Sequence, residues 1–194
     1  MSDTSLSLLD RLGRGDDGTA WQRLVDLYTP LLHAWLGRYE LQPADRDDLT
    51  QEVLGIVVRE LPAFQHNGRP GAFRSWLRTI VVHALRRFWR ARAYRPPAPG
   101  GSPFEEYLSQ LEDPHSGLSG EWDREHDRYL LRRLLELVER DFRPATWQAF
   151  QRLVLERRPA AEVAADLGLS VNAVLIAKSR VLERLRQEGR GLID

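Results

Sequence analysis

Apolar residues recur at helical spacing along most of this chain, and this feature most limits what the chain can fold into. The longest apolar stripe runs from Phe73 to Phe88, where the side chains follow one another at steps of three and one residues over more than four turns. No run has the strict apolar–polar alternation or the Asn-Gly turn that is typical of antiparallel strands. The periodicity therefore predicts an all-α protein.

One stretch, residues 96–124, interrupts this pattern. It contains two segments rich in proline, glycine and serine, 96–103 and 114–120, which predict flexible backbone. Between them, four apolar residues at i, i+3, i+4 and i+7 predict two turns of helix with an acidic polar side: Phe104, Tyr107, Leu108 and Leu111. We favour a helix docked on its own domain over an insert that binds a partner. The sequence thus predicts two small helical domains, 1–95 and 125–194, joined by a flexible Pro/Gly/acidic linker over 96–124.

Charge is segregated along the chain, although the net charge is zero. The 194 residues carry 28 Lys+Arg and 28 Asp+Glu, yet residues 61–103 contain eight arginines and no acid. Residues 96–142 carry a net charge of −6, whereas 1–95 and 143–194 each carry +3. Charges interact over a Debye length of about 8–10 Å, so a partner meets these local patches. The neutral total therefore does not exclude a polyanionic partner.

Several kinds of site are excluded by residue content. The chain has no Cys, which excludes disulfides, thiolate catalysis and Cys-based metal sites and is typical of a reducing cytosol. No two of the five histidines lie at i, i+3 or i, i+4, and no paired catalytic carboxylates, glycine-rich phosphate loop or nucleophile motif is present. No apolar run approaches the roughly 18 residues of a membrane span. We expect a cytoplasmic protein that is not an enzyme and has no metal, cofactor or membrane span.

The helix expected from Ala44 to just before Pro62 has a polar, partly acidic stripe beside its apolar one. This stripe includes Asp48, Gln51 and Glu52. Every surface helix needs a polar side, so the residues alone favour a solvated face.

The helix over residues 73–90 has a basic face opposite its apolar stripe. This face carries Arg74, Arg78, His83, Arg86, Arg87, Trp89 and Arg90. Arginines can follow phosphates while aromatic rings stack on unpaired bases, so the face suits nucleic acid. Alternatively, the arginines pair with the acidic helix over residues 40–60. Composition leaves both interpretations open.

The C-terminal stretch predicts a helix-turn-helix. Pro159 suits a first helical turn, Gly168 suits a left-handed C-cap, and Ser170 suits the N-cap of the second helix. The side chains expected to hold the two helices together are Val163, Ala164, Leu167, Val174, Ala177 and Val181. The outward face of the second helix carries Asn172, Leu175, Ile176, Ser179 and Arg180. A recognition helix presents this face to the major groove, where Leu175 and Ile176 would meet thymine methyls or a protein partner. The pattern favours DNA binding.

Together these motifs resemble the extracytoplasmic-function group of the bacterial sigma-70 family, over nearly the whole chain. Residues 47–53, Asp-Asp-Leu-Thr-Gln-Glu-Val, resemble the D-x-x-Q-E motif that grips the clamp helices of RNA polymerase. Residues 73–80 and 84–90 resemble the helix that melts and reads the minus-ten element. Residues 167–174 and 178–180 resemble the reader of the minus-thirty-five element.

The resemblance implies a sigma factor that binds core RNA polymerase and directs promoter recognition, melting and transcription initiation. It implies polymerase binding by Asp48, Gln51 and Glu52, and minus-ten contacts by the basic face of residues 74–90. It implies minus-thirty-five contacts by Ser170, Asn172, Leu175, Ile176, Ser179 and Arg180. It also allows an anti-sigma factor as a further partner. The alternative is a stand-alone helix-turn-helix regulator that acts without polymerase.

Overall fold

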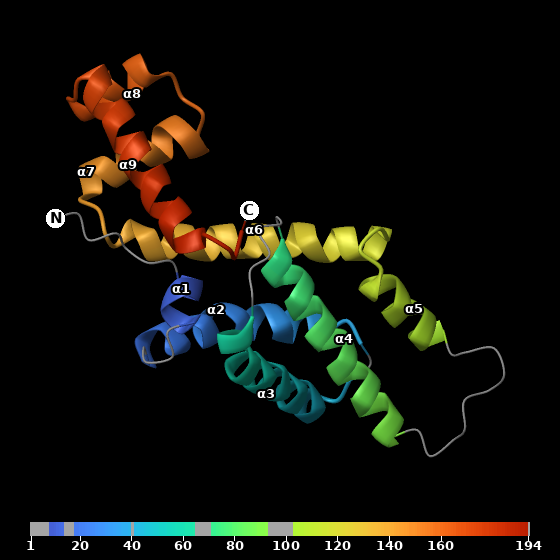
Figure 1. Cartoon of the computed structure of the whole chain (residues 1–194). Coiled ribbons are helices and arrows are strands. Elements are labelled where there is room, and N and C mark those ends of the chain that lie inside the picture. Colours follow the sequence, from blue (N-terminus) through green and yellow to red (C-terminus); the bar gives the residue numbers. More distant parts are fainter. Residues whose placement is uncertain (1–7, 14–17, 40, 65–70, 93–102, 194) are drawn as a thin grey trace. The chain divides into compact units, whose positions relative to one another are not determined.

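The computed structural model describes residues 8–13, 18–39, 41–64, 71–92 and 103–193, and every regular element in these ranges is a helix (Figure 1). The elements are α1 (Leu8–Gly13), α2 (Gly18–Leu36), α3 (Pro43–Glu60), the 3-10 turn η1 (Leu61–Ala63), α4 (Ala72–Arg92), α5 (Pro103–Glu112), α6 (Gly117–Glu139), α7 (Pro144–Phe150), the π-helical η2 (Gln151–Leu155), α8 (Ala160–Leu167) and α9 (Val171–Gly189). The all-α class predicted from the periodicity is confirmed.

These residues form two compact units, residues 8–130 with 191–193, and residues 131–190. Helix α6 contributes residues 117–130 to the first unit and 131–139 to the second. The first unit therefore extends beyond residue 95, and part of the expected linker is helical. The reason is apolar burial, since Leu108, Leu111 and Trp122 all lie within the core of this unit. Residues 96–102 of the expected linker lie outside the described residues.

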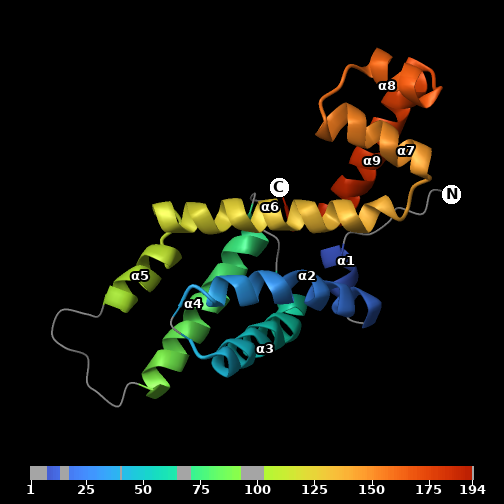
Figure 2. The same ribbon diagram turned by 180° about the vertical axis from the view of Figure 1, so that it is seen from behind.

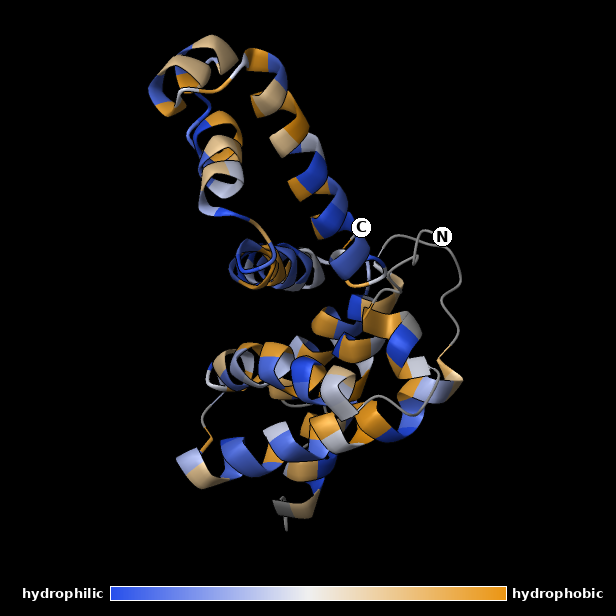
Figure 3. Cartoon of the chain, turned by 90° about the vertical axis from the view of Figure 1, so that its left-hand side faces the viewer, coloured by the Kyte–Doolittle hydropathy of each residue, from blue (hydrophilic) through white to orange (hydrophobic). Residues whose placement is uncertain are grey.

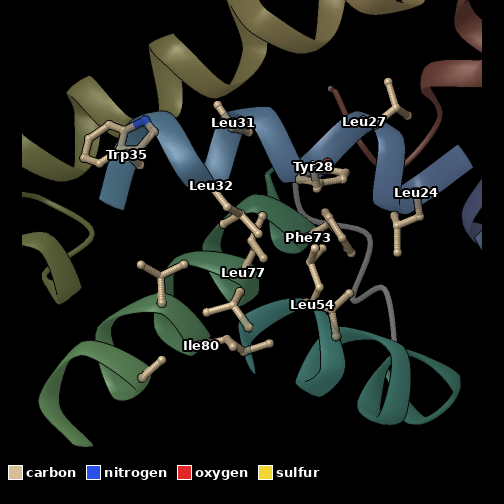
Figure 4. Close-up of a cluster of buried hydrophobic side chains, with 14 of the residues drawn as sticks. Leu24, Leu27, Tyr28, Leu31, Leu32, Trp35, Leu54, Phe73, Leu77 and Ile80 are labelled. Carbon is tan, nitrogen blue, oxygen red and sulfur yellow. The ribbon is translucent and has the colours of Figure 1, made fainter. Parts of the chain in front are cut away.

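The core of the first unit forms where α3 packs against both α2 and α4 (Figure 4). Tyr28 of α2 meets Phe73 of α4 with ring centroids 5.5 Å apart in an edge-on arrangement. Leu77 of α4 and Leu54 of α3 belong to the same buried cluster. Helix α5 then packs on α4, as the amphipathic pattern around Leu108 predicts.

The second unit contains the expected helix-turn-helix, α8 and α9, with α7 packed beside both (Figure 2). Gly168 ends α8 with a left-handed φ of 63°, and the Ser170 side chain accepts a hydrogen bond from the Ala173 N–H at the start of α9. The axes of α8 and α9 meet at 103°, within the range typical of a helix-turn-helix. Hydrophobic and hydrophilic residues alternate along the ribbon of α9, the long helix that runs toward the C-terminus in Figure 3, as in an amphipathic helix.

Side-chain packing between α7, α8 and α9 agrees with the prediction. The buried cluster consists of Ala149, Val163, Ala164, Val174 and Ala177, with Leu153, Leu167 and Leu169 packed against it. The small side chains of Ala149, Ala164 and Ala177 let the helices approach closely. The packing leaves the opposite face of α9 exposed.

Candidate functional site

Helix α3 presents its polar stripe outward because its apolar stripe is anchored in the core. Leu49 and Val53 are buried, whereas Asp48, Gln51 and Glu52 are exposed. The Glu52 carboxylate accepts a hydrogen bond from Arg87 of α4 at 2.6 Å. Both side chains are about half exposed, and such surface pairs contribute only about 0.2–1 kcal/mol. The polar stripe of α3 thus remains accessible to a partner.

The structure divides the basic face of α4 into exposed and enclosed residues. His83, Arg87 and Arg90 are exposed. Trp89 is half-buried, with its ring 5.1 Å from that of Phe104 on α5. The remaining three residues, Arg74, Arg78 and Arg86, make ion pairs with carboxylates of α5 and α6.

Arg78 is the most enclosed of these arginines, with 4% of its side chain exposed. It donates hydrogen bonds to the Asp123 carboxylate at 3.0 Å and to the Ser119 carbonyl at 3.4 Å. Burial lowers the pKa of Arg78, and the Asp123 charge opposes that shift. Its neighbour Arg74 donates to both oxygens of Asp127, at 3.0 and 3.2 Å. In this structure carboxylates of α6 occupy both guanidiniums, so their minus-ten role stays a prediction that requires these ion pairs to open.

Arg86 joins α4 to the acidic side of α5. It donates to Glu105 at 2.8 Å and to Glu112 at 2.5 Å. Burial acts to lower the pKa of Arg86, but the two carboxylates outweigh it and raise this pKa above its ordinary value. His83 is more exposed, and its Nε2 lies 3.7 Å from the Glu112 carboxylate.

The first turns of α6 are held on α2 by buried aromatic and polar contacts. The rings of Trp122 and Trp35 meet edge-on with centroids 4.6 Å apart. His126 is fully buried, with Nε2 at 3.2 Å from the Tyr28 hydroxyl and Nδ1 at 3.0 Å from the Asp127 carboxylate. A carboxylate only accepts hydrogen bonds, so Nδ1 donates to Asp127, and in the neutral ring Nε2 then accepts from the Tyr28 hydroxyl. The acids of α6 are therefore fixed beside the arginines of α4.

A more exposed ion pair lies on the same helix. Arg38 donates to Glu125 at 2.5 and 2.7 Å and to Glu121 at 3.3 Å. Its guanidinium also lies 4.1 Å from the centre of the Trp35 ring. This cluster adds a second, more solvated link between α6 and the turn that follows α2.

These ionic partners of α4 differ from the ones the sequence suggested. The sequence suggests the acidic helix over residues 40–60 as the partner, and among the described residues that helix supplies one carboxylate, Glu52 for Arg87. The charge pattern did contain a signal for the other partners, the carboxylates of α5 and α6. The acid-free segment 61–103 is followed directly by a strongly acidic segment. Sequence reasoning therefore missed Glu105, Glu112, Asp123 and Asp127.

The outward face of α9 keeps all of its predicted residues in solvent. Exposed residues on this helix and its cap are Ser170, Asn172, Leu175, Ile176, Ser179 and Arg180. Ser170 is also a structural residue, since it caps α9. Ser179 donates its hydroxyl hydrogen to the Leu175 carbonyl. The face can meet a DNA groove through both polar and apolar side chains.

Within the described ranges, no group of three or more His, Cys, Asp or Glu side chains could hold a metal ion. In the same ranges no single helix has the length and hydropathy to cross a bilayer, and the bent pair α8 and α9 meets those measures only when taken together.

Comparison with known proteins identifies one family model and several relatives. Residues 24–95, which include α3 and α4, match the model described as sigma-70 region 2. The ECF RNA polymerase sigma factor SigD of Mycobacterium tuberculosis is 29% identical over 185 residues, covering 89% of this chain and 78% of SigD. The ECF RNA polymerase sigma factor ShbA of Streptomyces griseus is 28% identical over 189 residues, covering 93% of this chain and 92% of ShbA.

A solved structure also aligns with this chain. It is described as CnrH in complex with the cytosolic domain of CnrY, and the alignment covers 94% of this chain and 95% of that one. The sequence identity is 20% and the TM-score is 0.38.

Proposed function

We propose how this chain, which belongs to the sigma-70 family as a sigma factor of the extracytoplasmic-function group, divides promoter recognition between its two units. The chain binds core RNA polymerase and directs promoter recognition, melting and transcription initiation. In our proposal the first unit binds polymerase and the minus-ten element, and the second unit binds the minus-thirty-five element. The observation that carries the proposal is the region 2 match over residues 24–95, because it coincides with the exposed face of α3 and with α4.

Polymerase binding is assigned to Asp48, Gln51 and Glu52. Their exposure on one face supports this assignment, since Leu49 and Val53 hold the other face in the core. Acidic and amide side chains on a rigid helix suit a basic partner surface through complementary charge.

Minus-ten contact is assigned to the exposed part of the α4 face. His83, Arg87 and Arg90 can reach phosphates or bases, and Trp89 offers a half-buried ring for stacking. Arg74, Arg78 and Arg86 are ion-paired to α5 and α6 in this structure, so minus-ten contact by these three requires the ion pairs to break. Breaking their ion pairs would leave charges enclosed without partners, at a cost of about 3–5 kcal/mol for a fully buried pair.

Minus-thirty-five contact is assigned to the outward face of α9. The right-angled arrangement of α8 and α9 supports it, because a recognition helix enters the major groove in this geometry. Ser170, Asn172, Ser179 and Arg180 supply hydrogen-bond donors and acceptors there.

Promoter opening then follows from binding, with no catalytic step by this chain. Two DNA-binding surfaces on one polymerase act together through effective concentration, although each is weak alone. Capture of unpaired bases by the first unit stabilises the opened strand. The zero net charge keeps the free chain from binding DNA strongly by itself, and we place it in the cytoplasm with polymerase. An anti-sigma partner stays a prediction.

The test uses core polymerase from the host bacterium and the full-length chain. Asp48→Arg should reduce co-purification with core and run-off transcription by at least about tenfold, because it places a cation on the acidic face. Glu106→Arg makes the same charge change at an exposed position of α5 and should leave both nearly unchanged. Equal effects of the two variants would refute the assignment of the α3 face. Failure of the wild-type chain to bind core would refute the proposed function.

A further inference from the structure

The exposed face of α9 is apolar in its first half, which is unusual for a surface that meets DNA. Val171, Leu175 and Ile176 expose 44%, 45% and 43% of their surface. They are three of the six large hydrophobic residues that are exposed in the described part of the chain. Buried Val174 and Ala177 hold the other side of the helix against α7 and α8, so these three cannot turn inward.

The apolar side chains are interleaved with polar ones in two rows. Val171, Leu175 and Ser179 follow one another at i, i+4 spacing, and Asn172, Ile176 and Arg180 form the neighbouring row. The apolar side chains of both rows therefore lie in the N-terminal half of the helix. That half enters the major groove when a helix-turn-helix binds DNA.

The surroundings of this apolar face favour nucleic acid over protein. Residues 167–182 contain no acid, and Lys178 and Arg180 are exposed on the same helix. Three side chains are far fewer than the roughly 20–30 residues that each partner contributes to a stable protein interface. Cations beside a small apolar patch match the phosphates that flank a groove.

We propose that Val171, Leu175 and Ile176 make this sigma factor selective for thymine methyl groups in its upstream promoter element. In the major groove the C5 methyl of thymine is the one apolar group on a base edge. An aliphatic side chain over any other base edge would desolvate donors or acceptors without replacing their hydrogen bonds, which is unfavourable. The inference rests on the proposed function, since it requires α9 to read duplex DNA within a polymerase complex.

Replacing thymine by uracil tests this directly, because uracil pairs identically and lacks the methyl. Active promoters are first selected from a randomised DNA library by transcription with the reconstituted holoenzyme. The selected upstream elements should contain a preferred thymine on one strand. Templates with deoxyuridine at that position should form open complexes about three- to tenfold less well with the wild-type chain.

Two variants and a control assign the effect to the helix face. Leu175→Ala and Ile176→Ala should each bring the ratio of open-complex formation on thymine templates to that on uracil templates closer to one, and the double variant, which keeps Val171, should bring it closer still. Both side chains are exposed, so the core stays intact. Leu155→Ala truncates an equally exposed aliphatic residue of η2 and should keep the wild-type ratio.

The outcomes separate the inference from the function on which it rests. The inference would be overturned if the selected elements have no preferred thymine. It would also be overturned if the wild-type chain forms open complexes equally well on thymine and uracil templates. In both cases transcription itself would still support the sigma function. Equal loss of transcription on thymine and uracil templates in Leu175→Ala and Ile176→Ala would also overturn it, because the face would then contact a protein. No transcript from any library member would overturn the proposed function and the inference together.

Discussion

Asp123→Asn should destabilise the first unit far more than the loss of an ordinary surface ion pair. Asp123 of α6 is the carboxylate that faces the Arg78 guanidinium at 3.0 Å, and it also lies 3.5 Å from Arg74. The substitution keeps the shape of the side chain and removes its charge. Arg78 then stays enclosed without a hydrogen-bonded carboxylate, since Asp127 bonds to Arg74 and Asp113 acts on Arg78 only through its charge.

The size of this loss in stability depends on how exposed each side chain of the ion pair is to solvent. Removing one member of a fully buried pair costs about 3–5 kcal/mol, whereas exposed pairs contribute about 0.2–1 kcal/mol. Arg78 has 4% of its side chain exposed and Asp123 has 34%, so the pair lies nearer the buried limit. We expect a loss of about 2–3 kcal/mol in the free energy of unfolding, after reducing the buried value for the partly solvated carboxylate.

Urea unfolding of the full-length chain, followed by tryptophan fluorescence, measures this loss. Five of the six tryptophans lie in residues 8–130, so the signal reports mainly on the first unit. Glu121→Gln is the matched control. It removes a carboxylate from the same helix, but the Glu121 side chain is 47% exposed. The control should cost no more than about 0.5 kcal/mol.

A double-mutant cycle separates the ion pair from other effects of the substitution. Arg78→Met removes the enclosed charge and keeps an apolar side chain of similar length. In that background Asp123→Asn should cost no more than about 1 kcal/mol, since only Arg74 still depends on it. The reasoning is refuted if Asp123→Asn matches Glu121→Gln, or if its cost is the same with and without Arg78.

Further predictions concern pH and backbone conformation. Burial raises the pKa of Tyr28 and of Tyr39, so both contribute stability that is present below the unfolded value of 10 and lost as pH rises above it. The Tyr28→Phe, Tyr39→Phe double variant should therefore show a shallower fall in Tm above pH 10 than the wild type. Gly168→Ala should destabilise by about 1 kcal/mol, because its φ of 63° strains any side chain even where space is open. Gly55→Ala, also with open space but inside helix α3, should instead stabilise by about 0.5–1 kcal/mol, and calorimetry that gives both changes the same sign would contradict this account.

Local features of the sequence predicted much of the fold. The stripe from Phe73 to Phe88 lies within α4, and Gly168 and Ser170 end and begin the helices of the helix-turn-helix as expected. The exposed faces of α3 and α9 also follow from periodicity, because burying one stripe exposes the other. The extent of the first unit did not follow, since the proline- and glycine-rich composition around α5 suggested a linker.

What the sequence determined by itself is the set of helices, their caps and the two faces of each. These depend on contacts between residues three to five positions apart, so the local pattern is sufficient. Only the tertiary structure decided which arginines of α4 remain accessible. Arg78 and Asp123 lie 45 positions apart in the chain, and Arg74 and Asp127 lie 53 apart. Charge patterns show that such partners exist, but packing of Trp122 and Leu108 into the core selects which carboxylate meets which guanidinium.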